Sequence, residues 1–236
     1  MKLYDLHTHV LPGVDDGAPN MECALQMLEN AAASDVKLLA VTPHCSNAYG
    51  NYQDNRLNRL FFQLQQASSS IPIDLVLGAE ARVDAYFLPS LSQGKIPTIN
   101  GSRYLLTEFS PTETSFEETL FSILEMGYIP LIAHPERYVT VCRDPQIVER
   151  WLDMGCHLQL TSGSILGEYG KTVQRTSAFL LRNDLVACVA SDAHGLHHRS
   201  NFLMNAYDHL AVQYSKQYAD CLLCENPMRI CNNEDL

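Results

Sequence analysis

The stretch Asp5-Leu-His-Thr-His-Val-Leu-Pro-Gly-Val-Asp-Asp-Gly17 decides how the rest of the sequence is interpreted. The apolar run before it predicts a buried strand that ends where His7 and His9 begin. Because side chains alternate faces along a strand, these two imidazoles point the same way, about 6.5–7 Å apart, and one metal ion can hold both. The following turn brings Asp16 back toward the strand end, while Asp15 is expected to shape the turn itself.

Composition limits the class of protein. The 236 residues are 46% hydrophobic and 18% charged, which predicts a single domain over residues 1–236. The last ten residues or so, from Pro227 on, are expected to form a loose tail. The net charge of −11 and the lack of any Lys/Arg run exclude a nucleic-acid binder. The start of the chain does not resemble a signal peptide, and no apolar run approaches the roughly 18 residues of a membrane span. We therefore expect a cytoplasmic protein without membrane insertion.

The eight cysteines are scattered along the chain, so we expect reduced thiols rather than a disulfide framework. Cys221-Leu-Leu-Cys224 has the spacing of a zinc or redox motif. It lacks a second pair and lies in a helix-like stretch, so we expect neither function there.

Predicted strands alternate with predicted helices along the whole chain. The strand before His7 is followed by strands over residues 36–41, 73–77, 104–107, 129–133, 156–160 and 185–190. Helices are predicted over 21–34 with Asn20 as N-cap, and over 53–69, 116–126, 146–154, 173–182 and 201–225. Such βα units build a parallel α/β sheet, and seven strands fit a closed or nearly closed TIM-like barrel. In these barrels the active site lies just past the carboxyl ends of the strands.

Side chains of metal-ligand type follow nearly every predicted strand. These five imidazoles and four carboxylates are His7, His9, Asp16, His44, Glu80, Glu108, His134, Asp192 and His194. Four unpaired carboxylates in one barrel mouth would repel one another, and divalent cations remove that cost. A tetrahedral site uses four protein ligands, or three and a water, so nine candidates indicate two or three ions that share bridging carboxylates.

Seven motifs together carry a resemblance to a known family: His7-Thr-His9, Asp15-Asp16-Gly17, Thr42-Pro43-His44, Gly78-Ala79-Glu80, Thr107-Glu108-Phe109, Ala133-His134-Pro135-Glu136-Arg137 and Ser191-Asp192-Ala193-His194. They resemble the polymerase and histidinol phosphatase (PHP) superfamily. Within it, the chain is most similar to the CpsB/YwqE type, the bacterial protein-tyrosine phosphatases of capsule and exopolysaccharide operons. The similarity runs from Asp5 to about Arg199 and includes Leu158-Gln-Leu-Thr-Ser-Gly-Ser164, expected here to form a loop from residue 161.

The resemblance implies a distorted (β/α)7 barrel, the PHP fold, that holds three divalent ions, with manganese typical and iron, zinc or magnesium as alternatives. It groups His7, His9, Glu80 and Asp192 around one ion, Glu80, Glu108 and His134 around a second, and Asp16, His44 and His194 around a third. It also implies that Arg137 and Arg199 contact phosphate. Gly195 stands where family members often have Asn, which leaves the geometry of the 195–199 loop open.

The activity implied by the resemblance is a metal-dependent protein-tyrosine phosphatase, a hydrolase with a metal-bridged hydroxide as nucleophile. The implied substrate is a bacterial tyrosine kinase that regulates capsule or exopolysaccharide synthesis. His9, His194 or a metal-bound water could donate a proton to the leaving group, and the sequence does not choose among them. A thiolate mechanism is excluded, because no cysteine has an Arg six residues later.

The sequence is compatible with two other functions. One is a small-molecule phosphomonoesterase such as a histidinol-phosphate phosphatase, and the other is a non-catalytic regulatory barrel, which is disfavoured because no ligand position is substituted. Among the remaining polar residues, three tyrosines are candidates to stack on a substrate ring: Tyr49, Tyr52 and Tyr169. Four histidines are not expected to bind metal: His157, His197, His198 and His209. His197 and His198 are the first exceptions to consider, because they neighbour Arg199.

Overall fold

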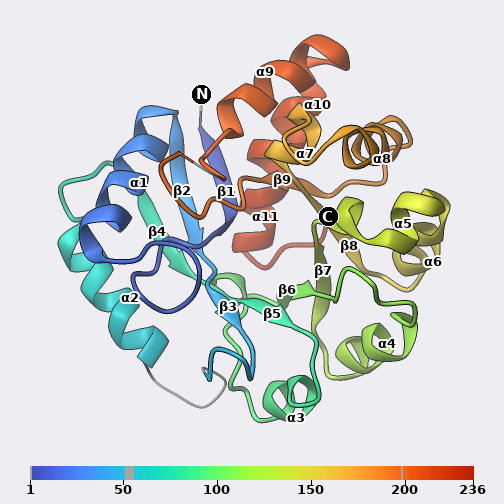
Figure 1. Ribbon diagram of the computed structural model, residues 1–236, viewed down its shortest axis with the longest axis horizontal. Coiled ribbons are helices and arrows are strands. Elements are labelled where there is room, and N and C mark those ends of the chain that lie inside the picture. Colours follow the sequence, from blue (N-terminus) through green and yellow to red (C-terminus); the bar gives the residue numbers. More distant parts are fainter. Residues whose placement is uncertain (1, 51–55, 198) are drawn as a thin grey trace.

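The computed structural model describes residues 2–50, 56–197 and 199–236. Its centre is a ring of parallel strands, and most helices lie outside that ring (Figure 1). The strands are β1 (Leu3–Thr8), β2 (Val36–Val41), β3 (His44–Cys45), β4 (Asp74–Leu77), β5 (Glu80–Arg82), β6 (Tyr104–Glu108), β7 (Ile129–Ala133), β8 (His157–Thr161) and β9 (Cys188–Ala190). They pair as a three-stranded sheet, β1-β2-β4, and a six-stranded sheet, β3-β5-β6-β7-β8-β9.

The two sheets form one seven-membered barrel. β3 continues β2 after a bend at Pro43, and β5 continues β4 after a bend at Gly78. Pro43 has no N–H to donate, so the ladder is interrupted there. The Gly78 N–H still donates to the Val41 carbonyl at 2.9 Å, and the Glu80 N–H donates to the Pro43 carbonyl at 3.0 Å. The predicted distorted (β/α)7 barrel is therefore confirmed.

The first and last strands close the barrel through a short contact. Thr8 forms a parallel bridge with Ala193, and the His9 N–H donates to the Ala193 carbonyl at 2.9 Å. The Asp192 N–H donates to the His7 carbonyl at 2.8 Å. The closing hydrogen bonds therefore involve the same residues that carry the candidate ligands of β1 and β9.

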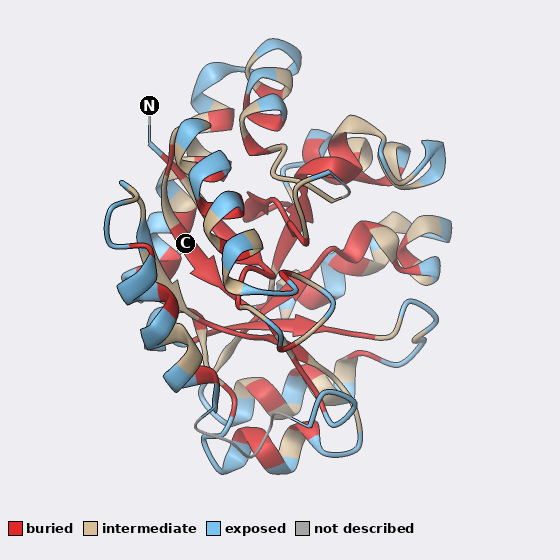
Figure 2. Ribbon diagram, turned by 60° about the vertical axis from the view of Figure 1, so that its left-hand side comes forward, coloured by how far each residue is buried: buried red, intermediate tan, exposed pale blue. Residues whose placement is uncertain are grey.

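The helices cover the strands with one apolar face each. They are α1 (Met21–Ala33), α2 (Arg56–Ala67), α3 (Phe87–Ser92), α4 (Glu117–Glu125), α5 (Val139–Arg143), α6 (Val148–Asp153), α7 (Ser162–Leu166), α8 (Lys171–Arg182), α9 (Leu203–Gln213), α10 (Lys216–Asp220) and α11 (Asn226–Cys231). Buried residues follow the strands and exposed residues lie on the outer helix faces (Figure 2). Asn20 caps α1 as predicted, because its side chain accepts from the Cys23 N–H at 2.9 Å. Part of the predicted helix over 53–69 lies outside the described residues, and α7 occupies the segment predicted as a loop from residue 161.

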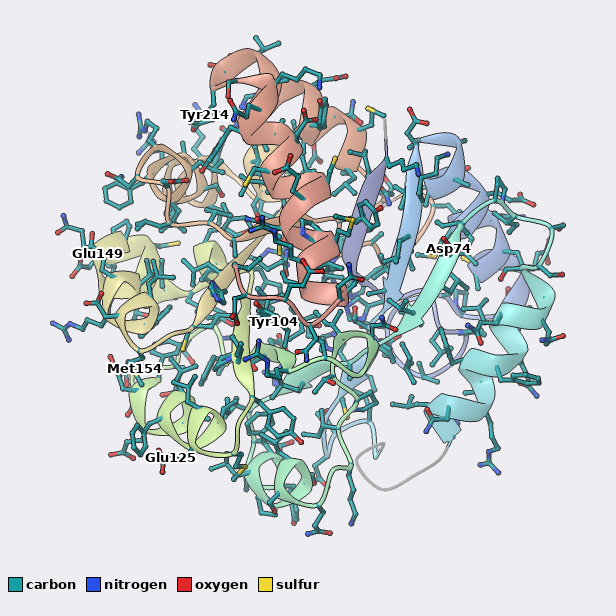
Figure 3. The ribbon with its side chains drawn as sticks, turned by 180° about the vertical axis from the view of Figure 1, so that it is seen from behind. Asp74, Tyr104, Glu125, Glu149, Met154 and Tyr214 are labelled. Carbon is teal, nitrogen blue, oxygen red and sulfur yellow. The ribbon has the colours of Figure 1, made fainter. Side chains whose placement is uncertain are left out.

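The segment after residue 225 differs from the loose tail predicted from the sequence. α11 buries Pro227, Ile230 and Cys231 at the end of the barrel where the strands begin. This end faces the reader in Figure 3. Beyond it, the Tyr104 hydroxyl donates to the Glu234 carbonyl at 2.7 Å, and the Arg103 N–H donates to the Asn233 side chain at 2.8 Å. The prediction of a tail was wrong because the apolar starts of the strands need a cover, which this segment supplies.

All eight cysteines are free thiols, as predicted. Cys221 and Cys224 lie on a π-helical turn, Cys221–Glu225, between α10 and α11. Among the helices in the described ranges, none is both long and apolar enough to cross a membrane.

Candidate metal centre

The nine predicted ligands gather at the carboxyl ends of the strands. His7 lies on β1, and His9 follows it. His44 begins β3, Glu80 begins β5 and Glu108 ends β6. His134 follows β7, Asp192 and His194 follow β9, and Asp16 lies in the 10–18 turn. Seven of the nine are buried, while His44 is partly exposed and Asp16 is exposed. The barrel therefore surrounds the cluster, and Asp16 lies on the solvent side.

Two of these ligands occupy unusual backbone positions. His134 has φ of 36° and Asp192 has φ of 54°, both in the left-handed region that side chains other than glycine seldom adopt. His134 directly follows β7, and Asp192 lies two residues after the end of β9. Such strained backbone persists only where the surroundings hold it, and it is common at functional sites.

Glu80 is the centre of the cluster. Its Oε2 lies 3.3 Å from His7 Nε2, 3.2 Å from His9 Nε2 and 2.9 Å from His44 Nδ1. Its Oε1 lies 2.7 Å from His134 Nε2. One carboxylate thus reaches four imidazoles, the position expected of a bridging ligand.

The ligand atoms form three overlapping groups, each within 4.8 Å: His9, Asp16, His44 and His194; His7, His9 and Glu80; and His44, Glu80 and Glu108. These groups differ from the predicted assignment. His9, predicted to bind a different ion from Asp16, also belongs to the group that contains Asp16. His44, predicted to bind with Asp16 and His194, also belongs to the group that contains Glu80 and Glu108. Asp192 lies at the margin, with its Oδ1 3.5 Å from Nε2 of both His7 and His9.

Three imidazoles are oriented from behind by acceptors. His7 Nδ1 lies 2.8 Å from Gln159 Oε1, His9 Nδ1 lies 2.8 Å from Asp15 Oδ2, and His194 Nδ1 lies 2.9 Å from the Asp192 carbonyl. With an acceptor at Nδ1, the proton sits there and the lone pair of Nε2 faces the cluster. Nε2 of His7 and His9 approach to 3.2 Å. Metal-binding histidines show this pattern of an outer acceptor at one nitrogen and an inward lone pair at the other.

Asp15 does more than shape the turn. It accepts from the Gly17 N–H at 3.0 Å, as a turn residue would, and also from the His44 N–H at 2.9 Å. Through its contact with His9 it links two candidate ligands to the 10–18 turn.

The electrostatics of the cluster are those of a site that needs positive charge. Burial opposes ionisation of Glu80, but the surrounding histidines lower its pKa well below the ordinary value. Burial opposes protonation of His9, but Asp15, Asp192 and Glu80 raise its pKa well above the ordinary value. Burial and the neighbouring Glu80 raise the pKa of Glu108. Without a bound cation, a second proton on such an imidazole offsets part of the carboxylate charge, and a metal ion at Nε2 would replace that proton.

Several buried polar atoms of the cluster have no hydrogen-bond partner within the described ranges. They are Glu80 Oε2, Glu108 Oε2, His134 Nδ1 and His194 Nε2. The imidazole nitrogens within 3.3 Å of Glu80 Oε2 make ion-pair contacts with it rather than directed hydrogen bonds. Buried acceptors left without donors cost free energy, and a cation satisfies them. The donor set of imidazole nitrogens and carboxylate oxygens therefore fits a group of divalent ions.

Two arginines flank the cluster at Asp192. Arg137 Nη1 donates to Asp192 Oδ2 at 2.7 Å, and Arg199 Nη2 donates to both carboxylate oxygens at 2.9 and 2.8 Å. The Arg137 guanidinium also lies 3.9 Å from the centre of the Tyr169 ring. Arg137 Nη2 and Arg199 Nε remain buried donors without an acceptor in the described part of the chain, so both guanidiniums retain capacity for an anion.

Two of the three candidate tyrosines lie near the cluster. The Tyr49 ring stacks on His44 with 5.4 Å between centroids, and Tyr169 supports Arg137. Tyr52 and His198 lie outside the described residues. None of the other three histidines, which are His157, His197 and His209, belongs to a ligand group among the described residues.

Sequence reasoning missed two neighbours of the ligands. Gln159, which orients His7, is a buried polar residue between Leu158 and Leu160 on β8, and that contrast was a usable signal. Arg82 lies two residues after Glu80 on β5, on the same face, and its Nη1 is 3.6 Å from Glu108 Oε2.

Comparisons with known proteins agree with the resemblance. The family model described as "Capsular polysaccharide synthesis, CpsB/CapC" matches residues 3–232. The chain is 32% identical to the tyrosine-protein phosphatase CpsB of Streptococcus pneumoniae, over 97% of this chain and 98% of that protein. It is 29% identical to the tyrosine-protein phosphatase YwqE of Bacillus subtilis (strain 168), over 99% of this chain and 93% of that protein.

Solved structures agree as well. The crystal structures of YwqE from Bacillus subtilis and CpsB from Streptococcus pneumoniae, described as unique metal-dependent tyrosine phosphatases, match with a TM-score of 0.92 and 28% identity, over 100% of this chain and 96% of that chain. The phosphotriesterase homology protein of Escherichia coli matches with a TM-score of 0.65 at 13% identity, which shows a shared fold. The chain belongs to the CpsB/CapC family of capsular polysaccharide synthesis.

Proposed function

We propose that this protein is a metal-dependent phosphotyrosine-protein phosphatase that uses three divalent ions, with manganese as the expected metal. The observation that carries the proposal is the set of inward Nε2 atoms on His7, His9 and His194, each oriented by an acceptor at Nδ1 and facing carboxylates. Seven of the nine candidate ligands fall into three overlapping groups, which supports three ions rather than one.

Divalent ions at such a site lower the pKa of a bound water toward neutrality and offset the charge of a phosphate dianion. His7, His9, Asp16, His44, Glu80, Glu108, His134, Asp192 and His194 would hold them. Glu80 would bridge, because its carboxylate already reaches four imidazoles.

Arg137 and Arg199 bind the substrate phosphate in this proposal. Asp192 holds both guanidiniums at the cluster, so their remaining donors point where phosphoryl oxygens would lie. Forked, charge-assisted hydrogen bonds from arginine favour a phosphate over a carboxylic ester. Tyr49 and Tyr169 would flank the aromatic ring of the substrate.

The leaving group needs little acid catalysis, because a phenol has a pKa near 10 and departs readily as a phenolate. Burial and the neighbouring His9 lower the pKa of His194 to about 2, so this imidazole is neutral and suited to be a ligand. The Nδ1 proton of His9 is held by Asp15. We therefore assign any proton donation to water rather than to His9 or His194.

The substrate assignment follows the names of the relatives, which are tyrosine-protein phosphatases. The family description links the chain to capsular polysaccharide synthesis. We infer that the substrate is a bacterial tyrosine kinase that controls this synthesis, and that dephosphorylation takes place in the cytoplasm, where ATP-dependent phosphorylation occurs.

The test measures phosphate release from a phosphotyrosyl peptide and from histidinol phosphate, with chelator-stripped protein before and after Mn²⁺ is added. The proposal expects manganese-dependent release from the peptide and little from histidinol phosphate. Asp192→Asn should lose this activity, while Asp208→Asn on the exposed face of α9 should keep it. Preference for histidinol phosphate would instead identify a small-molecule phosphatase, and silence on both substrates with metal bound would identify a regulatory barrel.

A further inference from the structure

The segment that carries Arg199 connects β9 to α9 and has cavities on both sides. Gly195, Leu196 and Ser200 line one cavity of about 190 Å³ that faces α1. His197, Arg199 and Ser200 line another of about 220 Å³ that faces Tyr169 and Phe202. Side chains in a close-packed interior are held by their neighbours, and a segment between two cavities has fewer of them. Hydrogen bonds must therefore fix the position of this segment.

Two hydrogen bonds anchor the segment in addition to those that the Arg199 guanidinium donates to Asp192. The His194 N–H donates to the Arg199 carbonyl at 2.8 Å, and Asn201 Nδ2 donates to Asp5 Oδ2 at 3.0 Å. The Asn201 Oδ1 in turn accepts from the Leu203 N–H at 3.0 Å, at the start of α9. Asn201 thus joins the segment to β1 and to α9 at once.

Asp5 is a fully buried carboxylate with a second contact. Its Oδ1 accepts from the Ser191 N–H at 2.9 Å, and Ser191 directly precedes Asp192. Asp192 is the residue that binds the Arg199 guanidinium. One carboxylate on β1 therefore holds both the strand end that carries Asp192 and the segment that carries Arg199.

We propose that Asp5 and Asn201 are positioning residues, a buried carboxylate–amide pair that sets the place of Arg199 relative to Asp192 for phosphate binding. This inference rests on the proposed function for the role of Arg199. Arg199 itself has φ of 49°, a left-handed conformation that a released segment would leave. Asp5 and Asn201 act through Arg199 and touch neither substrate nor metal.

The polarity of the pair allows a specific test. Asp5→Asn places the NH2 group of the new amide against the NH2 group of Asn201, so two donors face each other. If the Asn201 amide rotated, its NH2 group would instead face the Leu203 N–H, which is also a donor. Asn201→Asp places two carboxylates 3.0 Å apart. The double variant reverses the bond: the amide at position 5 donates to the carboxylate at position 201, which still accepts from Leu203, while Ser191 keeps an acceptor.

The experiment compares the four proteins, loaded with Mn²⁺, by kcat and KM on p-nitrophenyl phosphate, inhibition by inorganic phosphate, metal content, and hydrogen exchange of residues 195–202. We expect each single variant to lose about tenfold in phosphate affinity and kcat/KM, since a buried bond to a charged group is broken. Exchange in the segment should rise in both. The double variant should recover to within about threefold on every readout.

Tyr207→Phe is the matched control, because it removes a hydrogen bond between α9 and Asp220 at 2.7 Å without touching the segment. It should leave phosphate affinity unchanged. A double variant that stays as impaired as the singles overturns the proposal, as does a loss of bound metal that parallels the loss of activity. The hydrogen-exchange measurement does not depend on catalysis. A wild-type protein that hydrolyses no phosphomonoester would therefore refute the proposed function, while hydrogen exchange would still test whether Asp5 and Asn201 anchor the segment.

Discussion

Asp15→Ala tests whether the cluster depends on a residue that binds no metal itself. Asp15 accepts hydrogen bonds from His9, His44 and Gly17 at 2.8, 2.9 and 3.0 Å. The substitution removes the acceptor that fixes the His9 proton on Nδ1, and it leaves two backbone N–H groups without partners.

The magnitude follows from the pKa of Asp15. Burial opposes its ionisation, yet the hydrogen bond from His9 lowers the pKa from 3.8 to about 2, which corresponds to about 2 kcal/mol in favour of the charged form. We expect the free energy of unfolding to fall by about 2–3 kcal/mol, and metal affinity to fall about 10–100-fold, as for other outer partners of ligating histidines. Because the pKa is lowered on folding, this contribution is present above pH 4 and is lost as pH falls from about 4 toward 2.

The assay is competition for Mn²⁺ against a chromogenic chelator, together with urea unfolding of the metal-free protein at pH 7 and at pH 2, on either side of the range in which the Asp15 contribution is lost. Asp208→Ala, which removes one exposed carboxylate from α9, is the control and should change neither quantity. Metal affinity within threefold of wild type for Asp15→Ala would refute the reasoning, because His9 would then be oriented without its partner.

Three further substitutions test other parts of the structure. Gly17→Ala places a Cβ 2.0 Å from the His9 carbonyl oxygen. We therefore expect the free energy of unfolding in urea to fall by about 3 kcal/mol and the protein to bind one metal ion fewer per chain. A variant that binds metal normally would contradict the geometry. Tyr104→Phe removes the hydrogen bond to the Glu234 carbonyl, and should lower the free energy of unfolding by about 1 kcal/mol without changing kcat. An unchanged unfolding midpoint would show that the segment after α11 does not stabilise the barrel. Asp192→Ala should lower kcat/KM by more than about 100-fold while circular dichroism stays that of the folded barrel, and retained activity would remove Asp192 from the site.

The sequence predicted that the candidate ligands lie close together because two simple rules apply to them, the convergence of strand ends and the period of a strand. Apolar runs such as residues 129–133 mark buried strands, and a parallel barrel brings all strand ends to one mouth, so His134 and His7 could be placed together without any distance information. His7 and His9 share a face by the period of a strand.

Other features depend on contacts between distant segments, which local patterns do not encode. The bends that split β2 from β3 and β4 from β5 were not predicted, because Pro43 reads locally as the end of a strand. α11 covers the open end of the barrel, and the sequence of this segment has no periodicity that would have predicted the helix. The contact of Gln159 with His7 spans 152 positions in the chain.

The closure of the barrel between β1 and β9 has a consequence for synthesis. β1 is made first, yet its second neighbour is complete only when Ala193 has emerged to bridge Thr8. Until then, β1 presents one edge of unpaired N–H and C=O groups, the kind of edge that recruits other strands. Nascent chains that stall before β9 should therefore be the aggregation-prone species of this protein, and chaperones should engage ribosomes up to that point and release them after it.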